Sequence, residues 1–146
     1  MQLPLFDRLS EEYALDAEVG SRENFRRSIR HDIEALLNSK LHWHVWPEWY
    51  GELDRSLMTY GLPDFSSMPL SSQDGRDSLC RVVEQAIRTF EPRFVDVSVE
   101  TLDKEQPLDR ILKLRICAIC MIDGEPEEVV FDSEVEPVCL GIKVSE

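Results

Sequence analysis

Positive charge is scarce in this 146-residue chain. It has 16 lysines and arginines against 29 aspartates and glutamates, which gives a formal net charge of −13. Nucleic acid and anionic membranes repel a surface of that charge, so the composition argues against a protein that coats either of them. It also argues against an enzyme that must approach an anionic cell-wall polymer.

Glycine and long apolar runs are also rare. The chain has six glycines and neither a glycine-rich phosphate loop nor a Gly-x-Ser-x-Gly elbow. No run approaches the roughly 18 apolar residues of a membrane-spanning helix, so we expect no membrane insertion. The N-terminus lacks a basic start followed by an apolar run, so we expect no secretory signal. We therefore expect a cytoplasmic protein whose four cysteines are reduced. The 42% of hydrophobic residues nevertheless suffices for the core of one domain.

Two amphipathic helices are predicted in the first two thirds of the chain. The first begins at Ser21, a favourable N-cap, and runs to about Asn38. The second ends at Glu91 because Pro92 follows it, and a short helical stretch is expected between them over residues 53–60. The apolar stripes at helical spacing are Phe25, Ile29, Ile33, Leu36 and Leu37 in the first helix, and Leu79, Val82, Val83, Ala86, Ile87 and Phe90 in the second.

Beyond Pro92 the hydrophobic period changes from helical to alternating. Val95, Val97 and Val99 alternate with polar residues, which predicts a half-buried strand with the three valines on its buried face. Further strands are expected over residues 111–122 and 127–132, and residues 138–144 allow a fourth. Helices followed by consecutive strands predict an α+β fold, with two main N-terminal helices packed on a small antiparallel β-sheet of three to four strands.

The charges are unevenly distributed. Four arginines lie within nine residues in the first turns of the first helix, where the helix dipole disfavours cations. No lysine or arginine occurs over residues 116–142, where seven acids lie. Either a two-ended partner surface or two solvated faces would explain this division. The four arginines are Arg22, Arg26, Arg27 and Arg30.

A metal site is the first chemical alternative. Cys117 and Cys120 have the CxxC spacing, and His42 and His44 lie upstream. Residues three apart in a strand point to opposite faces, so these two sulfurs would not converge on one zinc ion. We interpret both cysteines as small buried hydrophobic residues and predict neither a metal nor a cofactor. His31 is expected on an exposed polar face.

Paired carboxylates for glycoside hydrolysis are the second alternative. Glu91 is the natural candidate for the acid, with Asp96 or Asp64 as the second group. Such a pair must flank a sugar-binding cleft, and burial must raise the pKa of the acid. Nothing in the sequence indicates that cleft. The aromatic loop of residues 41–50, which holds all three tryptophans, is explained equally well as a core flap or as a protein-binding patch.

The tripeptide Glu91-Pro92-Arg93 lies at the predicted helix-to-strand junction. Proline forces the residue before it into extended backbone, so Glu91 and Arg93 are expected to project in the same direction. A carboxylate at a helix C-terminus opposes the dipole, which indicates an ionic partner within the domain or on another chain. From the residues alone, a helix stop with a weak surface ion pair is the favoured explanation of the tripeptide.

Four stretches together resemble a known family. In order they are LFDRL (residues 5–9), SIRHDIEALLN (28–38), YGLPD (60–64) and EPRF (91–94). With the predicted helices between them, they resemble the baseplate wedge family of contractile injection machines, specifically the TssE-like subunit of type VI secretion systems. The resemblance covers about two thirds of the chain.

The resemblance implies a structural subunit and not an enzyme. TssE-like subunits join TssF-like, TssG-like and TssK-like proteins in the wedge, in a cytoplasmic machine docked at the inner membrane, and help to start polymerisation of the TssB/TssC sheath. It implies wedge contacts for Glu91, Pro92 and Arg93, and we add Arg26 and Arg30 from the arginine cluster as predicted partner-binding residues. It also implies that a sheath strand adds to a sheet edge. We expect residues 1–20 to be a docking segment and residues 21–146 to be one α+β wedge domain.

Overall fold

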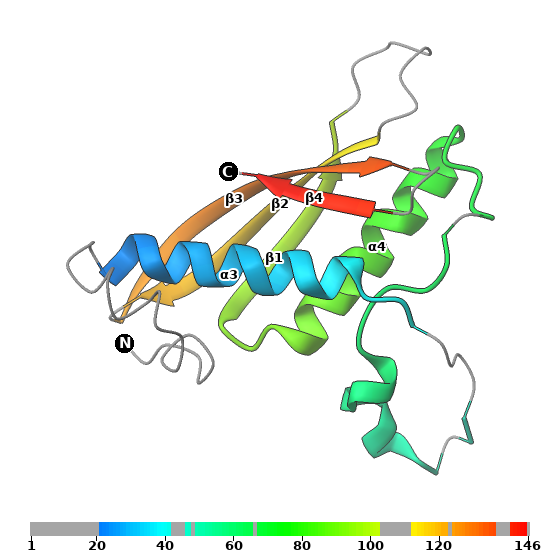
Figure 1. The fold of residues 1–146 in the computed structure, drawn as a ribbon, viewed down its shortest axis with the longest axis horizontal. Helices are drawn as coiled ribbons and strands as arrows, with labels where there is room; N and C mark the ends of the chain where they lie inside the picture. Colours follow the sequence, from blue (N-terminus) through cyan, green and yellow to red (C-terminus); the bar gives the residue numbers. More distant parts are fainter. Residues whose placement is uncertain are drawn as a thin grey trace.

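The computed structural model describes residues 21–41, 46–47, 49–65, 67–102, 112–122, 124–136 and 141–145. The predicted docking segment, residues 1–20, lies outside this part. Helices come first along the described chain and strands follow, which confirms the predicted α+β class (Figure 1). The elements are α3 (Ser21–Asn38), η1 (Gly51–Arg55), η2 (Leu57–Thr59), α4 (Gln73–Phe90), β1 (Phe94–Thr101), β2 (Leu112–Ile122), β3 (Glu125–Glu136) and β4 (Gly141–Ser145).

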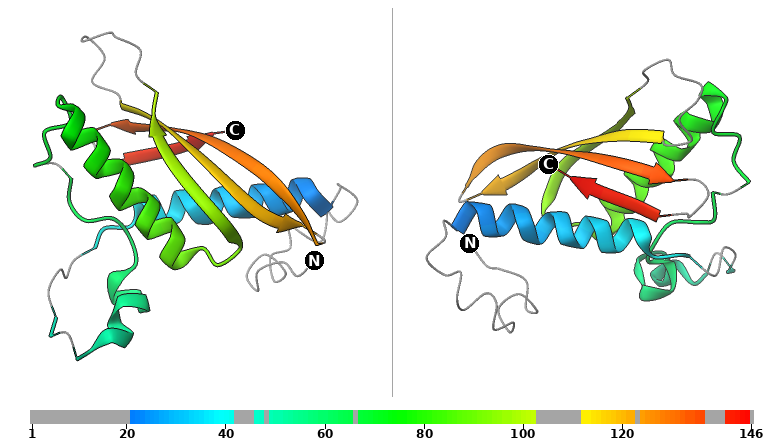
Figure 2. Two further views of the ribbon diagram at one scale, coloured as in Figure 1. Left: turned by 180° about the vertical axis from the view of Figure 1, so that it is seen from behind. Right: turned by 45° about the horizontal axis from the view of Figure 1, so that its top comes forward.

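The four strands form one antiparallel sheet in the order β1-β2-β3-β4, so β1 and β4 are its edges. Both long helices lie on the same side of the sheet, where α4 packs against β1 and α3 against β4 (Figures 1 and 2). Alternate strand residues face these helices and are almost completely buried, with Phe131 and Ile116 at 0% exposure. The other face of the sheet carries no described helix.

The helix boundaries follow local chemistry. The hydroxyl of Ser72 accepts a hydrogen bond from the Gly75 N–H at 3.1 Å and caps the start of α4. The same helix ends at Phe90, directly before the expected stop at Glu91. Residues 53–60 were expected to form one short helical stretch, but the chain forms η1 and η2 with Ser56 between them. The Ser56 hydroxyl accepts from the Met58 N–H and so starts the second of these 3₁₀ helices.

The predicted burial of Val95 is wrong. Its side chain is 67% exposed, whereas Val97 and Val99 are buried as expected. The register of β1 against β2 shifts between Phe94 and Asp96, which is the signature of a β-bulge. The extra residue breaks the strict alternation, so Val95 lies on the outer face of the sheet.

The last two strands differ from their predicted limits. The strand expected over residues 127–132 extends over all of β3, and it pairs with β2 from Glu125 to Val135. The fourth strand exists but covers residues 141–145. Part of its predicted range, residues 138–140, lies outside the described residues.

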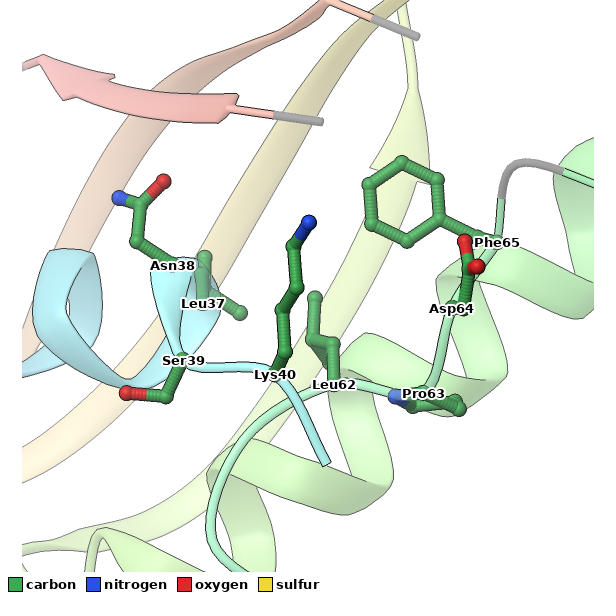
Figure 3. Close-up of a pocket in the computed structure, with 8 residues that line it drawn as sticks. All are labelled: Leu37, Asn38, Ser39, Lys40, Leu62, Pro63, Asp64 and Phe65. Atoms are coloured by element: carbon green, nitrogen blue, oxygen red, sulfur yellow. The ribbon is translucent and has the colours of Figure 1, made fainter. Parts of the chain in front are cut away.

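Directly after α3, Lys40 pairs with Leu62 in an isolated parallel β-bridge, and we call this contact the crossing (Figure 3). The Leu62 N–H donates to the Ser39 carbonyl at 2.8 Å, and the Leu41 N–H donates to the Leu62 carbonyl at 2.9 Å. The hollow at this crossing measures only about 10 Å³, which is room for about one water molecule. The crossing therefore fixes the position of Tyr60 and Gly61 and is not a ligand site.

Asn38 ties α3 to the edge of the sheet. Its side-chain amide donates to the Ile142 carbonyl at 2.7 Å, and its side-chain oxygen accepts from the Ile142 N–H at 2.9 Å. We expect Asn38→Ala to lower the free energy of unfolding by about 1–3 kcal/mol, because two hydrogen bonds at about 1 kcal/mol each are lost. Urea unfolding of the purified chain measures this. Asn38→Asp, which keeps the acceptor and loses the donor, serves as the matched control and should also be destabilised; wild-type stability in both variants would contradict the bridge.

Candidate functional site

The junction between α4 and β1 holds the tripeptide singled out in the sequence. Pro92 prevents the helix from continuing, and Glu91 takes a non-helical conformation (φ −113°, ψ 86°) as the C-cap. The Glu91 N–H still donates to the Ile87 carbonyl at 2.8 Å. Three residues after Glu91 the chain enters β1, so the junction is a tight turn with little conformational freedom.

Glu91 and Arg93 point in the same direction, as predicted, and bind each other. The Arg93 Nε–H donates to Glu91 Oε1 at 2.5 Å, and a second guanidinium nitrogen donates to Oε2. The Arg93 backbone N–H also reaches Oε1, at 3.2 Å. Only 7% of the Glu91 side chain and 21% of the Arg93 side chain are exposed, so this pair is largely removed from water.

The first helix completes the cluster. Asp32 of α3 accepts from the Arg93 guanidinium at 2.5 Å, and Ser28, one turn earlier, lies 3.4 Å from it. The guanidinium carbon lies 5.9 Å from the centre of the Phe25 ring. Burial alone would lower the pKa of Arg93, but the hydrogen bonds and charges of Glu91 and Asp32 outweigh it and raise that pKa. We call Ser28, Asp32, Glu91 and Arg93 the junction cluster.

A hollow of about 310 Å³ lies beside the junction cluster. Its walls combine the cluster with apolar side chains of α3 and with Tyr60 and Phe90, whose rings meet edge to face at 5.3 Å. A partner group entering here would meet the Asp32 carboxylate, whose side chain is 41% exposed, beside an apolar wall. The arrangement fits a basic or hydrogen-bonding side chain of another protein.

Ionisation of Tyr60 makes the stability of the chain depend on pH. Burial, followed by the charges of Asp32 and Glu91, raises the pKa of Tyr60 above its ordinary value of 10.0. The native state therefore holds this proton more tightly than the unfolded state, and the free energy of unfolding should fall as the pH rises above 10. Below pH 10 both states keep the proton and the contribution does not change.

We expect Tyr60→Phe to flatten this decline. Denaturant unfolding at pH 9, 10 and 11 compares the two slopes, and the variant should lose less stability between pH 10 and 11 than the wild type. Parallel slopes in the two proteins would show that Tyr60 does not titrate as proposed.

The arginine cluster of α3 serves the fold in part. Arg26 forms an ion pair with Glu127 of β3, and Arg22 lies 3.9 Å from the same carboxylate. The basic start of the helix therefore faces the acidic β2–β3 end of the sheet, which explains cations where the helix dipole disfavours them. Arg30 is half-buried and forms neither an ion pair nor a hydrogen bond with another described side chain. The junction cluster itself contains neither Arg26 nor Arg30.

The geometry does not favour paired catalytic carboxylates. A general acid must hold its own proton in the resting state, whereas both oxygens of Glu91 are bound by a guanidinium. Asp96 lies on β1 and is held by Arg88 at 2.9 Å. Asp64 lines the small hollow at the α3 crossing, whereas Glu91 lines the larger hollow beside the junction cluster, so the two carboxylates do not share a cleft.

The two CxxC cysteines point to opposite faces of β2, as predicted. Cys120 is fully buried, but Cys117 lies half-exposed on the outer face, so its predicted burial is wrong. Burial raises the pKa of both thiols, aided by nearby carboxylates. Among the described residues no group of three or more histidines, cysteines and acids is placed to hold a metal. His42 and His44 lie outside them, and His31 is exposed as expected.

The described part of the aromatic loop is not a core flap. Trp49 is 79% exposed and Tyr50 is 54% exposed. Trp46 is half-buried and donates from its indole N–H to Asp54 at 3.0 Å. Trp43 lies outside the described residues.

Sequence reasoning missed three members of the site, namely Ser28, Asp32 and Tyr60. Two of them lie more than 60 residues from Arg93, so no local pattern joins them to it. One feature of the sequence could have indicated Ser28 and Asp32: they lie one turn apart on α3 and flank its apolar stripe.

No helix in the described ranges is both long enough and apolar enough to span a membrane. The family model described as baseplate wedge protein gp25 matches residues 23–125, more than two thirds of the chain. No curated protein sequence matches. A solved structure described as "The baseplate complex from the type VI secretion system" contains a chain that is 22% identical, with a TM-score of 0.54. The alignment covers 80% of this chain and 98% of that one, and at this identity the likeness concerns the fold.

Proposed function

The chain belongs to the baseplate wedge protein gp25 family, which gives it a structural role in a baseplate, and from that premise we propose that its machine is a type VI secretion system. The subunit joins TssF-like, TssG-like and TssK-like proteins in a wedge on the cytoplasmic side of the inner membrane. Residues 21–146 form the wedge domain, and residues 1–20 are a segment that docks on this domain. The subunit performs no catalysis; a peptidoglycan-cleaving role has no support in the placement of Glu91.

The observation that carries the proposal is the junction cluster beside its hollow. The buried pair of Glu91 and Arg93 is locked by Pro92 on one side and by Asp32 on the other. This rigid charged wall lies next to the apolar surface of Tyr60 and Phe90. A preorganised wall of this kind gives a partner side chain a fixed geometry to bind, with little ordering cost.

Arg30 and Arg26 have different parts in this proposal. Arg30 is half-buried on α3 and forms no ion pair with another described residue, and in this proposal it binds an acidic group of a partner. Arg26 is already paired with Glu127, so it contributes by holding α3 against β3 and only secondarily by direct contact.

The sheath contact of the proposal uses an edge strand. The outward-facing backbone of β4 is occupied at Ile142 by Asn38, and that of β1 is occupied at Val97 by Arg88. Such side-chain covers protect an edge from unwanted pairing. We propose that a sheath strand displaces one of these covers when polymerisation begins.

Affinity purification of the tagged chain from its native cells, with mass spectrometry, tests the wedge proposal. We expect the wild type to recover TssF-like and TssG-like proteins, and Glu91→Ala/Arg93→Ala to recover at least tenfold less per folded molecule. Arg30→Glu, which reverses the charge of a half-buried side chain of α3, should reduce recovery severalfold. Arg55→Glu, an exposed change of equal charge on η1, is the matched control and should behave like the wild type. Absence of baseplate proteins from the wild-type sample would overturn the proposal.

A further inference from the structure

The strand β2 is apolar on both of its faces. Its segment Ile116–Ile122 contains no charged residue, although only alternate residues face the helices. Cys117, Ile119 and Met121 point to the outer face of the sheet, and Ile119 and Met121 are 40% and 49% exposed. A sheet face that contacts only water normally carries polar residues, and a strand apolar on both faces is typical of one covered on both sides.

Neighbouring strands extend this apolar surface. Val130 of β3 pairs with Cys117 and is 41% exposed. The β-bulge in β1 adds Val95, which lies between the partners of Ile119 and Cys120 and is 67% exposed. We define the outer apolar patch as Val95, Cys117, Ile119, Met121 and Val130.

Acidic residues flank the outer apolar patch. Asp96 and Glu128 pair with Ile119 from the two sides, and Glu100 lies further along β1. Glu100 and Glu128 form no ion pair within the described ranges, although Glu100 lies opposite Arg115 in the register of β1 and β2. Their charges act on the centre of the patch, since after burial they are the main causes that raise the pKa of the Cys117 thiol. The bases on this face are neutralised locally, Lys113 by Glu134 and Arg115 by Asp132.

We propose that the outer apolar patch is the docking surface for an amphipathic helix of another protein, whose apolar stripe is flanked by lysines or arginines. A helix laid on an open sheet face completes a layered packing of the kind that buries apolar sheet surface. Lysines and arginines along its edges would meet Glu100 and Glu128. The surface lies on the opposite face of the sheet from the helices that build the junction cluster, so it is separate from the contact proposed above.

Other occupants match the charge less well. Residues 1–20 of this chain carry five acids and one arginine, so the flanking carboxylates would repel that segment. A second copy would bring one acidic rim against another. Nucleic acid is repelled for the same reason.

Photo-crosslinking in the native cells tests the proposal. A benzoylphenylalanine residue replaces Ile119 in the full-length chain, and the same residue at Leu57, which is 90% exposed on η2, is the matched control. We expect Ile119 to crosslink a peptide of a different protein that has apolar residues at helical spacing flanked by lysine or arginine. No crosslink, a crosslink to residues 1–20 or to a second copy, a peptide without that basic pattern, or the same product from Leu57 would each overturn the proposal.

Charge reversal gives an independent readout. We expect Glu100→Lys/Glu128→Lys to reduce the Ile119 crosslink at least fivefold. Glu23→Lys/Glu52→Lys, which makes the same change in net charge at exposed sites elsewhere, should leave it unchanged. Circular dichroism confirms that both variants are folded. Equal crosslinking in the two variants would show that Glu100 and Glu128 do not attract the partner, which would overturn the proposal of a helix flanked by lysines or arginines. Neither the crosslinking result nor the charge-reversal result changes the expected recovery of wedge proteins through the junction cluster. Failure of the proposed docking surface can therefore be distinguished from failure of the proposed wedge function.

Discussion

Replacing Arg93 with alanine should lower the free energy of unfolding by about 3–5 kcal/mol, because it leaves the nearly buried Glu91 carboxylate without its cation. Glu91 receives three hydrogen bonds from Arg93, two from the guanidinium and one from the backbone. The substitution removes the two charged ones and also frees Asp32 from its contact at 2.5 Å. Urea unfolding of the purified full-length chain, at constant pH and salt, measures the loss.

Two comparisons separate this effect from ordinary loss of a salt bridge. Lys113→Ala removes an ion pair of 3.0 Å whose side chains are 56% and 48% exposed, so it should cost under about 1 kcal/mol. Glu91→Gln/Arg93→Met removes both charges and should recover part of the stability lost in Arg93→Ala, because no buried charge remains unpaired. If Arg93→Ala costs no more than Lys113→Ala, the junction cluster is not a buried ionic network.

Replacing Gly61 with alanine should lower the free energy of unfolding by about 2–4 kcal/mol, the sum of backbone strain and a forced displacement. Gly61 has φ +114°, a conformation that residues with a Cβ rarely adopt. An added Cβ would lie 2.4 Å from the Ser39 carbonyl oxygen, which itself binds the Leu62 N–H. The crossing that positions Tyr60 would have to open, so the hollow beside the junction cluster would change as well.

Two other glycines, Gly124 and Gly51, supply a graded control. Gly124 has φ +88° but open space around its Cβ position, so Gly124→Ala should cost only the conformational part, about 1–2 kcal/mol. Gly51 has neither a left-handed φ nor a close neighbour, and Gly51→Ala should change stability by less than about 0.5 kcal/mol. Thermal and urea unfolding of the three variants should give this order, and an equal loss at Gly61 and Gly124 would show that the Ser39 contact is unimportant.

The sequence predicts those parts of the fold that local chemistry determines. The end of α4 and the common direction of Glu91 and Arg93 both follow from Pro92, whose ring restricts the residue before it. The buried face of α3 follows from helical spacing, and the buried face of β2 follows from alternation. In each case the residues that decide the outcome are neighbours in the chain.

The features that the sequence did not reveal depend on contacts between distant segments. Asp32 reaches Arg93 across 61 positions of the chain, and only the packing of α3 beside α4 and β1 brings them together. The exposure of Val95 follows from a register shift against β2, which no alternation within β1 could indicate. The sequence likewise did not identify Glu127 as the partner of Arg26. The position of Arg26 near the start of a helix, where the dipole disfavours a cation, indicated only that some partner exists.

The family resemblance supplied what local chemistry left open. From the residues alone, a helix stop with a surface ion pair was the favoured explanation of Glu91-Pro92-Arg93, and the resemblance reversed it. The family match over residues 23–125 includes the tripeptide, and the structure shows it buried and bound to α3. Whether the cluster also binds a partner is the central functional question.

Amide hydrogen exchange of the chain in its purified assembly, compared with the free chain, tests that question most directly. We expect slower exchange in the assembly for peptides that cover residues 57–61 and 91–94, which include residues bordering the hollow, and no slowing over η1. Unchanged exchange at 57–61 and 91–94, with protection elsewhere, would contradict a partner contact at the junction cluster.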